Sequence, residues 1–309
     1  MFTRTMRRVA PAAAALGLGA LVLTGCAGGG DPLDPGTGGD DAGTITIGNQ
    51  AFPESELLAQ IYGQYLEANG YEVAYEAGIG SRETFITALQ DGSIDLIPDY
   101  AGNALIYADP DAEETSAEDV EAALPAALEP LGLAVTAAAP GEDSDALVVT
   151  REFASANGLE TIGDLAPIAA SVTLGANTEF EPRWRDGLAE VYGFEGWAFK
   201  AIDDYGGPGT LADLLAGAIQ VADIYTTTPS IAANDLVVLE DDLDLFAAQN
   251  IIPLLRADVL TPELADLLDA VSQKITTEVL LELNAEMAGD ARPSAADVAA
   301  AWLSSVGLL

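Results

Sequence analysis

The sequence predicts an α/β protein built from two lobes, each a mostly parallel sheet flanked by helices. Three observations support this fold class. From residue 44 onward, short β-branched runs alternate with amphipathic stretches at helical spacing. A pattern of helix, glycine and strand occurs twice. Half of the 309 residues are apolar, which is enough for a substantial core.

The first elements follow from local patterns. We expect, in order, a strand over 44–48, a helix over 54–68, a strand over 71–75 and a helix over 82–90. Ser81 precedes the second helix, and its hydroxyl can accept from a free backbone N–H of the first turn. This helix N-terminus is also a place for a ligand carboxylate, so Ser81 is a candidate contact. Gly78-x-Gly80 resembles half of a dinucleotide fingerprint, but the third glycine is absent, which disfavours nucleotide binding.

An internal echo indicates the two lobes. Residues 88–100 end a helix at Gly92, continue as a strand and reach Tyr100, and residues 214–225 repeat the pattern with Gly217 and Tyr225. Ligands of open α/β sheets bind beyond the carboxyl ends of the strands. We therefore expect the two tyrosines to face each other across a cleft; two unrelated core tyrosines are the alternative.

The remaining elements divide the chain. Strands are expected over 146–149, 171–174, 221–224 and 236–239, and helices near 162–165, 188–192, 211–216, 262–268, 270–285 and 295–304. The C-terminal helices have no matching strands, so we expect them to pack on the first lobe. The chain then crosses between the lobes near 137–140 and near 228–234. This predicts lobe I over 44–138 plus 232–309 and lobe II over 139–231.

The N-terminal residues are typical of a secretion signal. Arginines at positions 4, 7 and 8 precede an apolar stretch that ends in Leu23-Thr24-Gly25-Cys26, a bacterial lipobox pattern. We expect residues 1–25 to be a lipoprotein signal peptide, Cys26 to carry the lipid, and residues 26–43 to be a flexible acidic tether. The protein would then lie outside the cytoplasm, anchored to the outer face of the cell membrane. A signal peptide that merely contains a cysteine is the alternative.

Composition excludes several functions. The chain has 11 Lys+Arg against 50 Asp+Glu, a formal net charge of −39, which argues against nucleic-acid binding because such sites use basic residues to displace counterions from phosphates. It has no histidine, which removes Ser-His-Asp catalysis and His-ligated zinc. No Asp-x-Asp-x-Asp-Gly calcium loop occurs, and we expect neither metal nor cofactor.

Several motifs, in order, carry a family resemblance. The chain resembles the osmoprotectant substrate-binding proteins of ABC transporters, which serve the uptake of glycine betaine, choline and carnitine. The matching stretches are residues 47–55, 80–83, 94–102, 222–227, 238–242 and 281–284. The resemblance implies a type II periplasmic-binding-protein fold with an aromatic cage between the lobes. It also implies a monomer without enzymatic activity that delivers a small osmolyte to a membrane permease.

The resemblance also implies site residues. Tyr100 and Tyr225 match cage tyrosines, whose faces attract a quaternary ammonium that has no N–H to donate. Arg183 matches an arginine that holds a ligand carboxylate; a surface ion pair with neighbouring glutamates is the alternative. Gln50 stands where many relatives carry lysine. Phe52 offers an apolar wall or belongs to the core.

The chain departs from the family pattern in ways that bear on the ligand. Asp145 and Leu211 stand where many relatives carry further cage tyrosines, Asn103 replaces a threonine, and Thr228 replaces an aspartate. Either Tyr205, Tyr62 or Tyr107 then completes the cage, or the ligand is not a simple betaine. Asp145 could also oppose a cationic head group directly, which fits choline or a basic amino-acid-like compound.

Two other functions remain open from the sequence. A secreted hydrolase could use paired carboxylates such as Glu76 with Glu83, or Asp99 with Asp95. The same fold could also bind another small solute, such as an amino acid.

Overall fold

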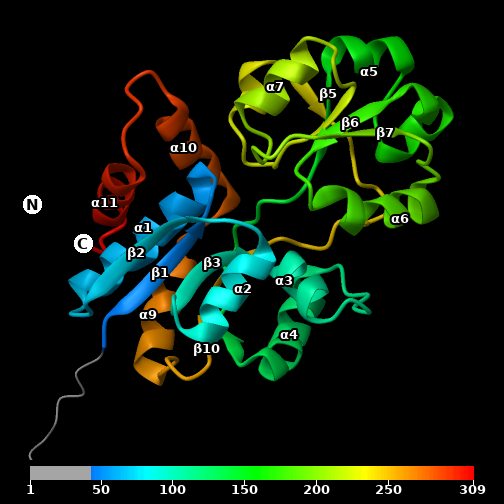
Figure 1. The fold of residues 1–309 in the computed structure, drawn as a ribbon. Coiled ribbons are helices and arrows are strands. Elements are labelled where there is room, and N and C mark those ends of the chain that lie inside the picture. The colour runs from blue at the N-terminus through cyan, green and yellow to red at the C-terminus, as the bar shows by residue number, and fades with distance from the viewer. Residues whose placement is uncertain (1–42) are drawn as a thin grey trace, which may run out of the picture. The chain divides into compact units, whose positions relative to one another are not determined.

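A computed structural model describes residues 43–309 of the chain. The expected signal peptide, Cys26 and the tether up to residue 42 lie outside the described residues. The described part contains two five-stranded sheets, each flanked by helices (Figure 1), which confirms the predicted fold class.

The first sheet has the strand order β2-β1-β3-β10-β4. Its strands are β1 (Ile45–Gln50), β2 (Val73–Ile79), β3 (Leu96–Tyr100), β4 (Leu133–Val135) and β10 (Ile251–Arg256). Its helices are α1 (Pro53–Ala68), α2 (Arg82–Asp91), α3 (Ala101–Ala108), α4 (Ala117–Leu128), α9 (Pro262–Ser272), α10 (Thr277–Ala288), α11 (Ala295–Ser305) and a 3-10 turn, η1 (Glu129–Leu131). We call this part lobe I.

The second sheet has the order β7-β6-β8-β5-β9. Its strands are β5 (Leu147–Thr150), β6 (Thr173–Ala176), β7 (Ala198–Ala201), β8 (Val221–Asp223) and β9 (Leu236–Val238). Its helices are α5 (Arg151–Asn157), the 3-10 helix η2 (Ile162–Ser171), α6 (Phe180–Tyr192), α7 (Pro208–Leu215) and α8 (Ser230–Ala233). We call this part lobe II.

Both sheets are mixed, because one strand in each runs antiparallel to the other four. In lobe I, β10 lies antiparallel between β3 and β4, with Pro253 opposite Pro98. In lobe II, β5 lies antiparallel between β8 and β9. The sequence patterns did not predict β10, since an internal proline argues against a strand in the middle of a sheet. They also did not predict the short strands β4 and β7.

The second crossing between the lobes lies later in the chain than the sequence predicts. β9 pairs with β5 in lobe II, and Phe246 still packs against Trp184 of that lobe, with ring centroids 4.9 Å apart. Ala247 is the first returning residue in a core cluster of lobe I. The predicted return at residue 232 is therefore too early, because the pairing of β9 keeps the chain in lobe II. The crossing lies close to residue 247.

The two crossing segments lie side by side and are joined through their backbones (Figure 1). Glu142 and Asn250 form an antiparallel bridge, and the N–H of Asp143 donates to the carbonyl of Gln249 at 3.1 Å. The first two N–H groups of α3, at Ala101 and Gly102, donate to carbonyls of Asn250 and Ala248. The start of α3, directly after Tyr100, is therefore held by the second crossing segment. We call the two paired crossing segments, residues 139–143 and 247–251, the hinge.

The C-terminal helices pack on lobe I, as expected. One core cluster joins α1 to α9, α10 and α11, with Leu57, Leu268, Leu283 and Trp302 among its members. The single helix predicted over 270–285 is instead two helices, because α9 ends at Ser272 and Thr276 caps α10 by accepting from the N–H of Val279. Within residues 43–309, no helix is both long and apolar enough to cross a membrane.

Candidate ligand-binding site

The two echo tyrosines lie where the repeat predicts them. Gly92 and Gly217 follow α2 and α7 in the left-handed conformation, with φ of 79° and 70°, which glycine adopts without strain. Tyr100 is the last residue of β3, and Tyr225 lies two residues beyond β8. Both residues line one cavity between the lobes.

Four aromatic side chains form what we call the aromatic cage. The Phe52 ring, just before α1, lies 6.1 Å from the Tyr100 ring, 5.6 Å from the Tyr205 ring and 5.8 Å from the Tyr225 ring, between centroids. Phe52 lines the cavity and also packs on a core cluster of lobe I, so it combines both expected positions. Of the three candidates to complete the cage, Tyr205 lines the cavity. Tyr62 is buried against Ser272, and Tyr107 packs on a core cluster of lobe I.

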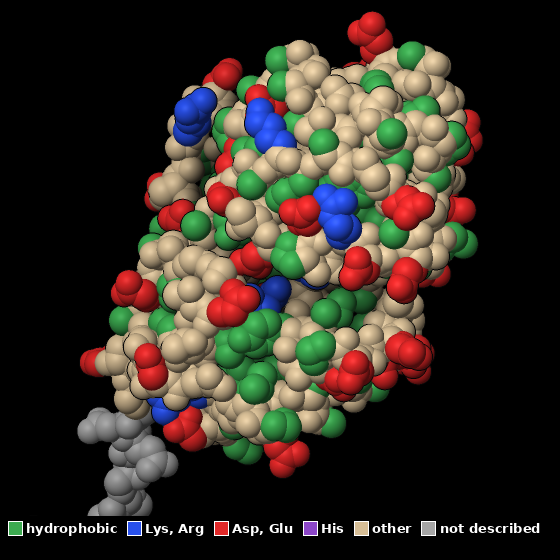
Figure 2. Space-filling model, turned by 45° about the vertical axis from the view of Figure 1, so that its right-hand side comes forward, with side chains coloured by type: hydrophobic (Ala, Val, Ile, Leu, Met, Phe, Trp, Pro, Cys, Tyr) green, Lys and Arg blue, Asp and Glu red, His purple; other side chains and the backbone are tan. Residues whose placement is uncertain are grey.

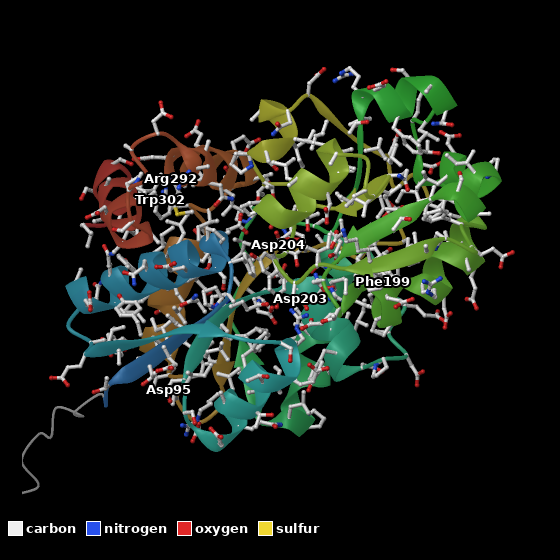
Figure 3. All side chains as sticks on the ribbon, turned by 45° about the horizontal axis from the view of Figure 1, so that its top comes forward. Asp95, Phe199, Asp203, Asp204, Arg292 and Trp302 are labelled. Carbon is white, nitrogen blue, oxygen red and sulfur yellow. The ribbon has the colours of Figure 1, made fainter. Side chains whose placement is uncertain are left out.

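A tight loop holds Tyr205 in the cage. Its φ is 52°, an unusual value for a residue with a side chain, and Gly206 follows at 75°. Asp204 fixes this loop by accepting from the N–H groups of Gly209 and Thr210 at the start of α7, at 2.6 and 3.1 Å. Asp203 and Asp204 lie between the two lobes (Figure 3). Backbone strain of this kind concentrates at functional sites.

The cavity among these rings is small, about 20 Å³, room for roughly one water molecule. A wider groove of about 560 Å³ adjoins it and shares Phe52, Asp143, Tyr205 and Tyr225. Figure 2 shows basic side chains at the floor of a hollow between the lobes, and Arg82 and Arg183 are the basic residues that line the cavity. A solute larger than water requires the lobes or the rings to move apart.

Polar atoms without partners point to the role of this cavity. Within residues 43–309, four buried atoms on residues that line it have no hydrogen-bond partner: Gln50 Nε2, Arg82 Nε, Asn103 Oδ1 and Asp145 Oδ1. Buried polar atoms normally have a hydrogen-bond partner, so four atoms without one at the same cavity are unusual. Two of these atoms are donors and two are acceptors.

The two arginines are both held by carboxylates. Arg183 lies 3.4 Å from Asp145 and 3.6 Å from Glu179. It therefore lines the cavity, as the family resemblance implied, and also pairs with a neighbouring glutamate, which was the alternative. Arg82 lies 2.5 Å from Asp99, and both side chains are buried. Asp145 also accepts from the indole N–H of Trp184 at 3.2 Å. Neither guanidinium faces the cavity as an uncompensated charge.

Two pairs of buried carboxyl groups surround the cage. Burial, and then Glu54, raises the pKa of Asp143 well above its usual value. Burial, and then Asp145, does the same to the pKa of Asp223. The cavity itself is lined by three acidic residues, Asp143, Asp145 and Glu179, and by two basic residues, Arg82 and Arg183.

Burial also raises the pKa of Tyr100 and Tyr225, with the nearby acids adding to the effect. Both phenols therefore stay neutral at physiological pH. Within residues 43–309, His, Cys, Asp and Glu side chains form no cluster of three that could hold a metal ion.

Replacing Asp223 with asparagine should stabilise the protein at neutral pH. Because the pKa of Asp223 is raised, the folded state keeps a proton that the unfolded state releases above about pH 4. The free energy of unfolding therefore falls as the pH rises from about 4 toward the pKa of the folded state. Melting curves should show a gain of a few degrees at pH 7–8 that shrinks as the pH falls toward 4. The same change at the exposed Asp266 should shift the melting temperature less at every pH. A melting temperature below that of the parent at pH 8 would contradict this assignment.

Ser81 is the predicted site residue that does not line the cavity. It precedes α2 as expected, but its hydroxyl makes no capping bond and lies 3.3 Å from Thr84 Oγ1. The next residue, Arg82, lines the cavity instead. Sequence reasoning also missed Asp143 and Glu179. Arg82 lies inside the motif over residues 80–83 of the family resemblance, so the sequence could have indicated it. Asp143 lies in the first crossing segment, where no motif of the sequence indicates a site residue.

Residues 43–305 match the family described as the substrate-binding domain of the ABC-type glycine betaine transport system, OpuAC. The chain belongs to this family. The OpuAC-family protein is 28% identical over 267 residues to the glycine-betaine-binding protein of Pseudomonas aeruginosa, covering 80% of this chain and 83% of that one. It is 27% identical over 274 residues to the carnitine transport binding protein OpuCC of Listeria monocytogenes, covering 82% and 84%.

Solved structures agree on the fold. A glycine betaine/carnitine/choline ABC transporter structure matches the OpuAC-family protein with a TM-score of 0.68 at 24% identity, over 85% of this chain and 99% of that one. The architecture of the OpuAC-family protein is thus that of the two-lobed solute-binding proteins of ABC transporters.

Proposed function

We propose that this protein captures a quaternary ammonium osmoprotectant between its lobes and delivers it to an ABC permease. The observation that carries the proposal is the aromatic cage, in which the Phe52 ring lies 5.6–6.1 Å from the rings of three tyrosines and all four side chains line one cavity. A quaternary ammonium has no N–H to donate, and aromatic faces attract it by about 0.5–2 kcal/mol per ring. Rings from both lobes would enclose it as the lobes close.

The polar end of the cavity supports a cation with a hydroxyl group. Gln50 Nε2 and Arg82 Nε can donate to a ligand oxygen, while Asn103 Oδ1 and Asp145 Oδ1 can accept from it. A carboxylate would use only the donors. The net charge of −39 also favours a ligand with net positive charge. We therefore place choline first and glycine betaine second.

Isothermal titration tests this assignment. Choline, glycine betaine, carnitine and a set of amino acids are titrated into the protein, with melting curves as a second readout. A ligand present at 100 times its Kd should add roughly 2.7 kcal/mol of stability. Binding of quaternary ammonium compounds alone supports the proposal. Binding of amino acids alone assigns the fold another solute, and binding of none of them rejects the proposal.

The protein acts in this proposal as a monomeric binding protein, not as an enzyme. Of the carboxylate pairs considered for hydrolysis, Asp99 is paired with Arg82, and Asp95 is paired with Arg256 at 3.2 Å. Asp95 lies at the end of lobe I remote from Asp203 and Asp204 (Figure 3). Release of chromophore from aryl glycosides by the purified protein would contradict this part of the proposal.

We expect Cys26 to carry a lipid that anchors the protein outside the membrane. Replacing Cys26 with alanine should move the protein from the membrane fraction to the soluble fraction, because a lipid chain adds about 0.8 kcal/mol of membrane affinity per buried CH₂. Mass spectrometry of the intact parent should show the added mass at this residue. Equal membrane retention of both proteins would argue against the anchor.

A further inference from the structure

Glu54 occupies a buried position where the two lobes meet. It lies in the first turn of α1, two residues after Phe52, and is 4% exposed. A carboxylate near a helix N-terminus is stabilised by the free N–H groups there. None of the sequence patterns assigned Glu54 a role, and it does not line the small cavity of the aromatic cage.

The carboxylate of Glu54 accepts hydrogen bonds from both lobes. Its Oε1 accepts from the Tyr100 hydroxyl at 2.8 Å. Its Oε2 accepts from the Thr227 hydroxyl at 2.6 Å and from the Asn284 amide at 2.5 Å. Tyr100 and Asn284 belong to lobe I, whereas Thr227 belongs to lobe II. One side chain thus connects a cage ring in lobe I to the other lobe.

Thr227 is tied directly to the cage and to the hinge. It follows Tyr225 by two residues, so its position constrains the segment that carries the second ring. Its N–H donates to Asp143 in the first crossing segment at 2.9 Å, and the Thr226 hydroxyl reaches the same carboxyl oxygen at 3.2 Å. A displacement of Thr227 from Glu54 would therefore also strain its contacts with the hinge.

We infer that Glu54 is a positioning residue that couples closure of the lobes to assembly of the aromatic cage. The Glu54 carboxylate orients the Tyr100 ring by accepting from the Tyr100 hydroxyl. When the Thr227 hydroxyl also donates to Glu54, the segment that carries Tyr225 is brought opposite the Tyr100 ring. Opening the lobes removes the Thr227 contact and leaves Tyr100 and Asn284 as the donors. The inference rests on the proposed function only for its ligand readout.

The test compares Thr227→Val, Glu54→Gln and Tyr100→Phe with the full-length parent. Choline affinity is measured by titration, and hydrogen exchange of residues 225–229 and 139–145 reports closure without ligand. We expect Thr227→Val to weaken choline binding about tenfold or more, since a hydrogen bond to a charged group is lost. Exchange in both segments should become faster. If Glu54→Gln does not fold, Thr227→Val carries the test.

Two controls separate positioning from stability. Thr150→Val removes a helix cap in the same lobe, where the Thr150 hydroxyl accepts from the N–H of Phe153, so it should lower the melting temperature but leave affinity and cleft exchange unchanged. The double variant with Tyr100→Phe and Thr227→Val should lose less affinity than the product of the single losses, because both act through Glu54.

The outcomes are distinct. If Thr227→Val behaves like Thr150→Val, or if the two single losses multiply fully, the inference is overturned. If the parent binds no quaternary ammonium compound, the proposed function fails. The exchange measurement then still decides whether Glu54 holds the lobes together, and unchanged exchange in Thr227→Val overturns the inference.

Discussion

Replacing both Tyr205 and Tyr225 with alanine should weaken choline binding by up to several hundredfold. Each aromatic face contributes about 0.5–2 kcal/mol to a bound cation, equal to roughly 2- to 30-fold in Kd, and the two losses multiply if the rings act independently. Both rings contact Phe52 in the cage. Titration of the single and double variants measures the effect.

Phenylalanine at the same two positions is the matched control, since it keeps the ring and removes only the hydroxyl. These variants should retain most of the affinity. A neutral analogue of choline, with carbon in place of the ammonium nitrogen, should bind the parent weakly and lose little in the alanine variants. If the alanine variants bind choline as the parent does, the aromatic cage is not the ligand site.

Of the substitutions proposed for this protein, Asp99→Asn should lower the free energy of unfolding the most. Asp99 is fully buried and lies 2.5 Å from Arg82, whose side chain is 9% exposed. The change keeps the shape but leaves a buried guanidinium without its counter-ion, which costs about 3–5 kcal/mol. The melting temperature should fall by roughly 10 °C.

Asp258→Asn provides the comparison, because Asp258 is 68% exposed in its pair with Arg256 and such pairs contribute little. The double variant Arg82→Met with Asp99→Leu should recover much of the lost stability, since it removes both charges. It should still bind choline more weakly than the parent, because Arg82 lines the cavity. A melting temperature of Asp99→Asn close to that of Asp258→Asn would contradict the importance of the buried pair.

Local patterns predicted the elements that have strong periodicity and clear ends. The strand over 44–48 and the helices over 54–68 and 295–304 correspond closely to β1, α1 and α11. The repeat ending in Tyr100 and Tyr225 located two of the three tyrosines that line the cavity, because glycine in the left-handed conformation and strand length are local properties.

Long-range pairing decided what the sequence did not predict. β10 contains Pro253, yet it is covered on both edges by β3 and β4, and no local pattern indicates that pairing. The crossing near residue 247 depends on the pairing of β9 with β5. Asp143 acquires its place in the cavity only because the hinge turns there. Tyr205 adopts a left-handed backbone that its own side chain disfavours, so its position depends on Asp204 and Gly206 around it.

The paired crossing segments set how solute capture proceeds. Backbone bonds join Ala139 to Ile251, Ile251 to Gly141 and Asp143 to Gln249, at 2.8, 3.0 and 3.1 Å. A two-stranded ribbon of this kind twists readily but resists stretching, because lengthening either strand breaks its ladder. If the lobes open, the ribbon would act as the axis of their rotation. Tyr100 and Tyr225 would then separate along arcs, and a single angle would set the width of the opened mouth.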